Sequence, residues 1–234
     1  MKILLAIVIF VLLTGCETAQ QVLNGMNTGT PALSTAEIAS GLKEALRIGT
    51  QNGTGKLSAA DGFFSNAAVK ILMPEEAKKV ESTLRSIGLG SLVDKAVLSM
   101  NRAAEDAAKS ATPIFVDAIK KMTITDALGI LKGGDYAATN YFKDKTTVSL
   151  TNAFRPVIEK ALTKVDATKY WNDVFTAYNK FAAKPVNTDL AGYVTERSLA
   201  GIFYEVGQEE LKIRKDPAAR VTELLKKVFG SNTP

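Results

Sequence analysis

The residue whose position most suggests chemistry is Glu210, because it falls on the apolar side of a predicted helix. A period of about 3.6 residues places it on one arc with Leu199, Ile202, Phe203, Val206 and Ile213. An ionised carboxylate is costly to bury unless it is paired, and Arg214 lies one helical turn later. Glu210 is therefore either a desolvated general acid in a cleft or half of a structural ion pair, and the spacing favours the ion pair.

A second polar group lies on the predicted polar side of a long Ala-rich helix and comprises Asn101, Arg102, Glu105 and Asp106. Arg102 could bind the carboxylate or phosphate of a ligand, because a guanidinium group makes paired hydrogen bonds with such anions. Alternatively, Arg102 pairs within its own helix with Glu105 or Asp106, at i+3 or i+4. The intrahelical pair is the favoured interpretation.

Two further candidates lie where helices are expected to begin. Gly133-Gly134-Asp135 precedes a helix, so its free N–H groups could hold an anion, although the Lys-Ser/Thr ending of a nucleotide loop is missing. The favoured interpretation is a glycine that ends one helix, followed by Asp135 as the N-cap of the next. Asp126 completes a predicted capping box with Thr123.

The composition excludes several kinds of catalyst. The chain of 234 residues contains no His, which rules out Ser-His-Asp and Cys-His catalysis and any His-ligated metal. A single Cys rules out an intrachain disulfide framework and a thiolate zinc cluster. We therefore assign no catalytic residue, and we expect neither a metal nor a cofactor.

The elements that must position these residues all read as helices. Helix-capping signals and apolar stripes recur from residue 34 onwards, and no stretch alternates with period two for long enough to make a strand. The sequence predicts an all-α fold, a compact bundle of about eight to ten amphipathic helices in one domain over residues 34–234.

Three local features are predicted from glycine, aromatic and proline positions. Gly49 to Gly55 is expected to form a loop. Apolar spacing from Phe63 to Ile71 predicts a helix that ends before Pro74. Asp216-Pro217 is expected to open the last helix, with Val221 facing inward.

The N-terminus resembles a lipoprotein signal. Lys2 precedes an apolar run over residues 3–13, which is too short to span a bilayer and ends in the lipobox-like Leu13-Thr14-Gly15-Cys16. We therefore expect residues 1–15 to be a signal peptide, Cys16 to carry lipid and residues 16–33 to form a flexible tether. Glu17 in place of Asp favours the outer membrane of a Gram-negative bacterium, with the mature chain facing the periplasm.

The charge balance argues against nucleic acid as a partner. The chain has 29 Lys and Arg against 24 Asp and Glu, and no basic stripe is interleaved with aromatic residues.

Several motifs resemble a bacterial family known as domain of unknown function 4197. They include Asn101-Arg102-Ala103-Ala104-Glu105, Gly133-Gly134-Asp135-Tyr136-Ala137-Ala138-Thr139, and Ile213-Arg214 with Asp216-Pro217-Ala218-Ala219-Arg220. The resemblance implies an exported, often lipidated protein without an assigned activity, and it brings no catalytic residues.

The leading hypothesis is a lipid-anchored helical module that binds or scaffolds another envelope component without chemistry of its own. A partner protein is the first expectation, and peptidoglycan or a lipid are the others. The alternatives are a His-independent hydrolase that uses Glu210, Glu105 or Asp135, and a carrier of an apolar ligand. The candidate residues for a polar or ligand site are Asn101, Arg102, Glu105, Asp126, Asp135, Glu210 and Arg214.

Overall fold

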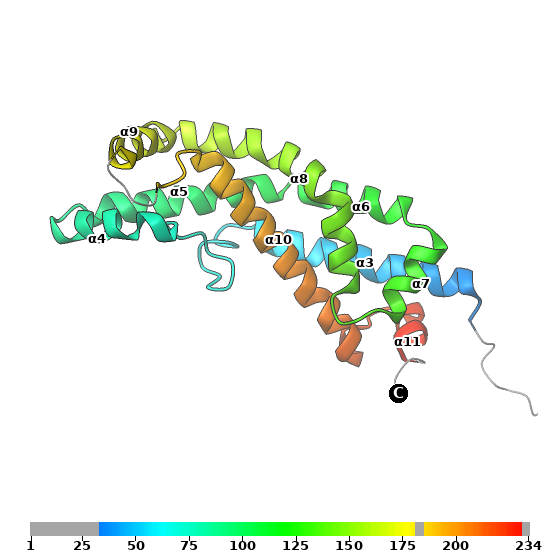
Figure 1. The fold of residues 1–234 in the computed structure, drawn as a ribbon. Coiled ribbons are helices and arrows are strands. Elements are labelled where there is room, and N and C mark those ends of the chain that lie inside the picture. Colours follow the sequence, from blue (N-terminus) through cyan, green and yellow to red (C-terminus); the bar gives the residue numbers. More distant parts are fainter. Residues whose placement is uncertain (1–32, 181–184, 231–234) are drawn as a thin grey trace, which may run out of the picture. The chain divides into compact units, whose positions relative to one another are not determined.

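Helices make up nearly all of the regular structure (Figure 1). The computed structural model describes residues 33–180 and 185–230, so the predicted signal peptide, Cys16 and the tether lie outside the described residues. Within those ranges there are nine α-helices and no strand, which confirms the all-α prediction. The helices are α3 (Thr35–Ser58), α4 (Lys78–Ser86), α5 (Gly90–Ala108), α6 (Ala111–Lys121), α7 (Ile124–Lys132), α8 (Ala137–Thr163), α9 (Ala167–Asn179), α10 (Leu190–Lys215) and α11 (Glu223–Gly230). Two 3-10 helices, Glu75–Ala77 and Pro217–Ala219, precede α4 and α11.

The residues from Thr35 onwards form one compact unit with a shared core. The long helix α10 packs against α8 and α3, and α8 also packs against α5 (Figure 1). Phe115 and Phe142 are fully buried and meet edge to face, with their ring centroids 5.2 Å apart. No helix in the described part of the chain is both long and apolar enough to cross a bilayer.

The prediction of a loop from Gly49 to Gly55 is wrong, because α3 runs through this stretch and ends at Ser58. The glycines serve close packing instead of a turn. A Cβ atom added at Gly53 would lie 3.3 Å from the backbone of Glu205 in α10, and one at Gly49 would lie 3.5 Å from Glu209. Small residues at these positions allow α3 and α10 to approach closely.

The predicted helix from Phe63 to Ile71 is also wrong. Residues 59–74 form an irregular segment of turns, which we call the 59–74 segment. The backbone N–H groups of Phe63 and Ile71 donate to side chains of α5 and not to helical carbonyl groups. Phe63 and Ile71 are nevertheless fully buried, so the apolar pattern identified core residues and not a helix.

The end of the chain also differs from the prediction. Asp216 does cap a proline-led turn by accepting a hydrogen bond from the Ala218 N–H, but that turn is a 3-10 helix, and α11 begins only at Glu223. Val221 lies between the two elements and is exposed, so its predicted inward position is wrong.

Candidate functional site

The candidate residues fall into separate places in the fold. Asn101, Arg102 and Glu105 lie on α5 against the 59–74 segment. Glu210 and Arg214 lie near the end of α10, beside the first turn of α8. Asp126 lies at the start of α7, and Asp135 lies in the turn between α7 and α8.

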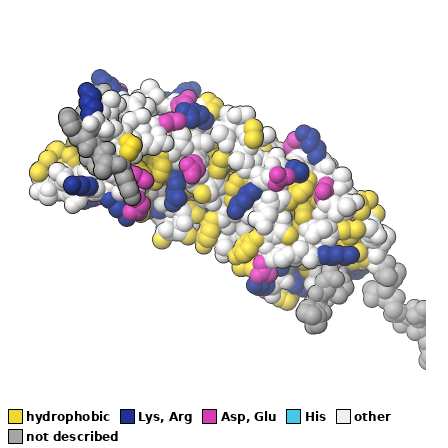
Figure 2. All heavy atoms as spheres, viewed as in Figure 1, with side chains coloured by type: hydrophobic (Ala, Val, Ile, Leu, Met, Phe, Trp, Pro, Cys, Tyr) yellow, Lys and Arg dark blue, Asp and Glu magenta, His cyan; other side chains and the backbone are white. Residues whose placement is uncertain are grey.

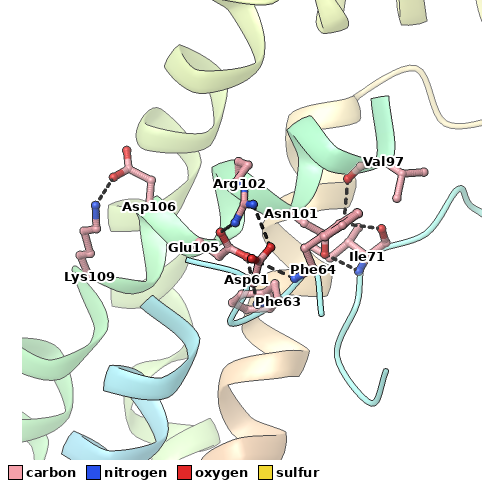
Figure 3. A network of polar contacts seen from close by, with 10 residues as sticks. All are labelled: Asp61, Phe63, Phe64, Ile71, Val97, Asn101, Arg102, Glu105, Asp106 and Lys109. Carbon is pink, nitrogen blue, oxygen red and sulfur yellow. Dashed lines mark hydrogen bonds and ion pairs between the residues drawn. The ribbon is translucent and has the colours of Figure 1, made fainter. Parts of the chain in front are cut away.

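The carboxylate of Glu105 holds the beginning of the 59–74 segment (Figure 3). Glu105 is 4% exposed, and its Oε1 atom accepts hydrogen bonds of 3.1 Å from the backbone N–H groups of both Phe63 and Phe64. Its Oε2 atom accepts from the Arg102 guanidinium at 2.7 Å, which confirms the predicted intrahelical pair. Arg102 also reaches Asp61 at 2.8 Å, so the two acids share one cation.

Asn101 holds the other end of the same segment through its side-chain amide (Figure 3). The amide oxygen accepts from the Ile71 N–H at 2.9 Å, and the amide nitrogen donates to the carbonyl oxygens of Ile71 at 2.8 Å and Val97 at 2.7 Å. Both Asn101 and Glu105 are buried, so their predicted place on a polar, solvated helix face is wrong. The 59–74 segment covers that side of α5 and supplies the hydrogen-bonding partners.

Glu210 occupies the anion-binding N-terminus of α8. Its Oε1 atom accepts from the Ala138 N–H at 2.9 Å, and its Oε2 atom accepts from the Thr139 N–H and hydroxyl, each at 2.8 Å. Arg214 donates to Oε1 from Nε at 3.0 Å and from Nη2 at 2.9 Å, which confirms the predicted ion pair. The anion held at the first turn of α8 is therefore a carboxylate of the protein itself.

Asp135 does not cap α8 as predicted. Tyr136 is the N-cap residue, and the Asp135 carboxylate instead contacts the Lys215 ammonium at 2.6 Å on the surface. Gly133 does end α7 as expected. Because Glu210 already satisfies the first N–H groups of α8, a capping side chain from Asp135 is not required.

Asp126 forms the predicted capping box with Thr123. Thr123 donates to the Asp126 carboxylate from its hydroxyl at 2.7 Å and from its backbone N–H at 2.9 Å. These two hydrogen bonds hold the pKa of the Asp126 carboxyl below its usual range, and the bond from the hydroxyl makes the larger contribution. The ionised Asp126 carboxylate therefore stabilises the folded state fully at a pH above its unfolded-state pKa. This contribution is lost as the pH falls through its lower folded-state pKa.

Replacing Thr123 with Ala is expected to raise the pKa of Asp126 towards 3.8, because the larger of the two hydrogen-bond contributions is removed. An NMR titration of the carboxyl carbon measures this shift directly. The matched control is Thr123→Ser, which retains a hydroxyl and should keep the pKa low. Equal pKa values in the Ala and Ser variants would contradict the assigned cause.

Sequence reasoning missed a third buried carboxylate, Glu205, which is 3% exposed. It contacts the Lys56 ammonium at 2.8 Å and accepts from the Asn66 amide at 2.7 Å. The helical period places Glu205 outside the apolar arc of α10, but the close approach of α3 at Gly53 covers it. The glycines within α3 were the signal for that approach, and they were interpreted as a loop.

An open groove of about 520 Å³ lies along α10 beside these contacts. Its walls come from α10, from the end of α3 at Lys56 and from the 59–74 segment at Asn66. Tyr204, Gln208 and Lys212 of α10 line it. Eight of its ten lining residues carry polar or charged side chains, so the groove is suited to a polar ligand.

The described residues form no metal centre, and the face shown in Figure 2 carries no broad field of one charge. Among the described residues, no group of three or more His, Cys, Asp or Glu side chains is placed to hold a metal ion. Figure 2 shows basic and acidic side chains interspersed over the face in view. Recognition on that face would therefore depend on local arrangements of charge and not on the overall field.

Comparisons with known proteins identify the family and leave its activity open. No curated protein and no solved structure matched the chain. A family model described as "Protein of unknown function (DUF4197)" matches residues 32–230, which is most of the chain. The chain therefore belongs to this family of proteins of unknown function.

Proposed function

We propose that the protein is a lipid-anchored, non-catalytic binding module of the bacterial cell envelope, facing the periplasm. The lipobox-like residues ending at Cys16 support the anchor. The open groove along α10 supports binding, because its polar groups are accessible to a ligand.

One observation favours a binding role over a hydrolytic one: the three buried carboxylates already form hydrogen bonds and ion pairs within the protein. Glu105 and Glu210 each accept from two backbone N–H groups and pair with an arginine, and Glu205 pairs with Lys56 and Asn66. A general acid or base must reach the proton of a substrate. These side chains instead connect segments of the fold, and they are buried.

The form of the groove favours binding of a polar component over carriage of an apolar one. A carrier encloses an apolar ligand in a largely apolar cavity. The groove is open, and most of its lining side chains are polar. The ligand that it suits is therefore one that stays partly in water.

The test is made in intact cells with two readouts. In cells supplied with labelled fatty acid, the natural chain is expected to carry the label and Cys16→Ala to lose it, because the thiol is the predicted acyl acceptor. With a photoreactive residue at Tyr204, irradiation is expected to give a reproducible adduct with an envelope component, because Tyr204 lines the groove.

The control places the same photoreactive residue at Val148 on α8, which is 74% exposed and does not line the groove. Label retained by Cys16→Ala would overturn the anchor. Equal adducts from positions 148 and 204, or none from either, would overturn the binding role.

A further inference from the structure

The groove presents a row of polar side chains that form no hydrogen bond or ion pair within the described part of the chain. Tyr204, Gln208 and Lys212 follow one another at intervals of four residues on α10, so they are about 6 Å apart along the helix axis. Their side chains leave the hydroxyl, the amide and the ammonium group accessible from the groove. Leu211 and Lys215 continue this lining towards the end of the helix.

The wall opposite α10 is irregular backbone held in one conformation. Glu105 binds the N–H groups of Phe63 and Phe64, Asn101 binds both backbone groups of Ile71, and Glu205 binds the side chain of Asn66. Segments without regular structure commonly carry binding residues when a rigid scaffold fixes them. A wall fixed in this way binds a ligand without a further cost of ordering.

The lining of the groove carries three Lys against two Glu, a net charge of +1. The side chains of Lys56 and Lys215 are 60% and 61% exposed, and Lys212 is also exposed. Of the acids, Glu205 is buried against Lys56, and Glu209 is half-buried and accepts from the Asn52 amide at 3.1 Å. Lys215 is paired with the Asp135 carboxylate at 2.6 Å, as Lys56 is with Glu205. Lys212 is therefore the lysine of the lining that forms no ion pair within the described residues, and its ammonium group favours an anion.

The lining argues against an apolar anchor from a protein partner. Only Ala68 and Leu211 among the lining residues lack a polar group. The energetic centre of a protein interface is a well-packed, desolvated cluster in which Lys and Glu are depleted. The groove offers instead one exposed aromatic ring, Tyr204, beside amides and amines, and this combination suits a sugar.

We propose that the groove binds a glycan that carries carboxylates, with one of these carboxylates on Lys212. A sugar ring stacks on Tyr204, and the Gln208 amide bonds a hydroxyl or acetamido group. This inference rests on the proposed function, because the protein would encounter such a glycan only if it faces the periplasm. Insoluble peptidoglycan has the required chemistry, because stem peptides with free carboxylates are attached to its sugar backbone.

The test is co-sedimentation of the full chain, purified in detergent, with peptidoglycan sacculi. We expect the chain to pellet with sacculi and not with chitin, which has a similar sugar backbone without carboxylates. The double variant Tyr204→Ala/Lys212→Gln should bind sacculi at least about tenfold more weakly, as expected from the loss of one charge-assisted contact and one stacking contact. Added salt should weaken binding by the natural chain.

Lys120→Gln is the matched control, because Lys120 is exposed on α6 and does not line the groove. It should bind sacculi like the natural chain, and all variants should melt at the same temperature, since the substituted side chains are exposed. Equal binding to chitin, an unaffected double variant, or binding to poly-L-glutamate without binding to sacculi would overturn the glycan proposal. A Tyr204 adduct in cells alongside such a result would leave the binding role intact and remove only the glycan.

Discussion

Replacing Glu210 with Ala is expected to lower the free energy of unfolding by about 3–5 kcal/mol, the usual cost of removing one partner from a buried ion pair. The Arg214 side chain is only 12% exposed and would keep its charge without its anion. The Ala138 and Thr139 N–H groups would lose their acceptor at the first turn of α8. One substitution thus leaves both a cation and a helix end without a partner.

Urea denaturation with an unchanged m-value measures this loss. The control is Glu223→Ala, whose pair with Lys226 is exposed to solvent, so the loss should be much smaller than that of Glu210→Ala. Glu210→Gln should fall between the two, because an amide retains one acceptor oxygen but no charge for Arg214. A loss of less than about 1 kcal/mol for Glu210→Ala would show that the carboxylate does not hold α8 to α10.

The pairing of Glu210 with Arg214 was predictable because both residues lie on one helix. The helical period decides which face each occupies, and a spacing of four residues brings them together. The occupation of the α8 N-terminus was not predictable. Glu210 and the start of α8 at Ala138 are 72 residues apart in the sequence, and no local pattern indicates that one binds the other. Only the packing of α10 against α8 joins them.

The prediction for Asn101 and Glu105 was wrong for a different reason. Helical periodicity assigned them to a solvated face because it considers one helix at a time. An irregular segment has no period, so nothing in the local pattern indicated that residues 59–74 cover that face of α5. The groove was missed for the same reason, since its walls come from three parts of the chain.

Replacing Asn101 with Leu is expected to destabilise the fold by about 2–6 kcal/mol, because two buried polar groups would lose their partner at about 1–3 kcal/mol each. The side chain of Leu has a similar size, so the change removes hydrogen bonds with little loss of volume. Ile71 would keep its buried N–H and carbonyl groups without the amide that satisfies them. Urea denaturation gives the global loss, and hydrogen exchange at the Ile71 amide reports local opening.

Asn179 provides a matched control, because its amide makes the same two bonds with the backbone of Val186, both at 2.7 Å, from a half-buried position. Water can replace those bonds more easily, so Asn179→Leu should cost less than Asn101→Leu. Equal costs would show that burial is not what makes the Asn101 amide important. Asn101 does not line the groove, yet its variant should bind sacculi more weakly, because the 59–74 segment that forms one wall would no longer be fixed.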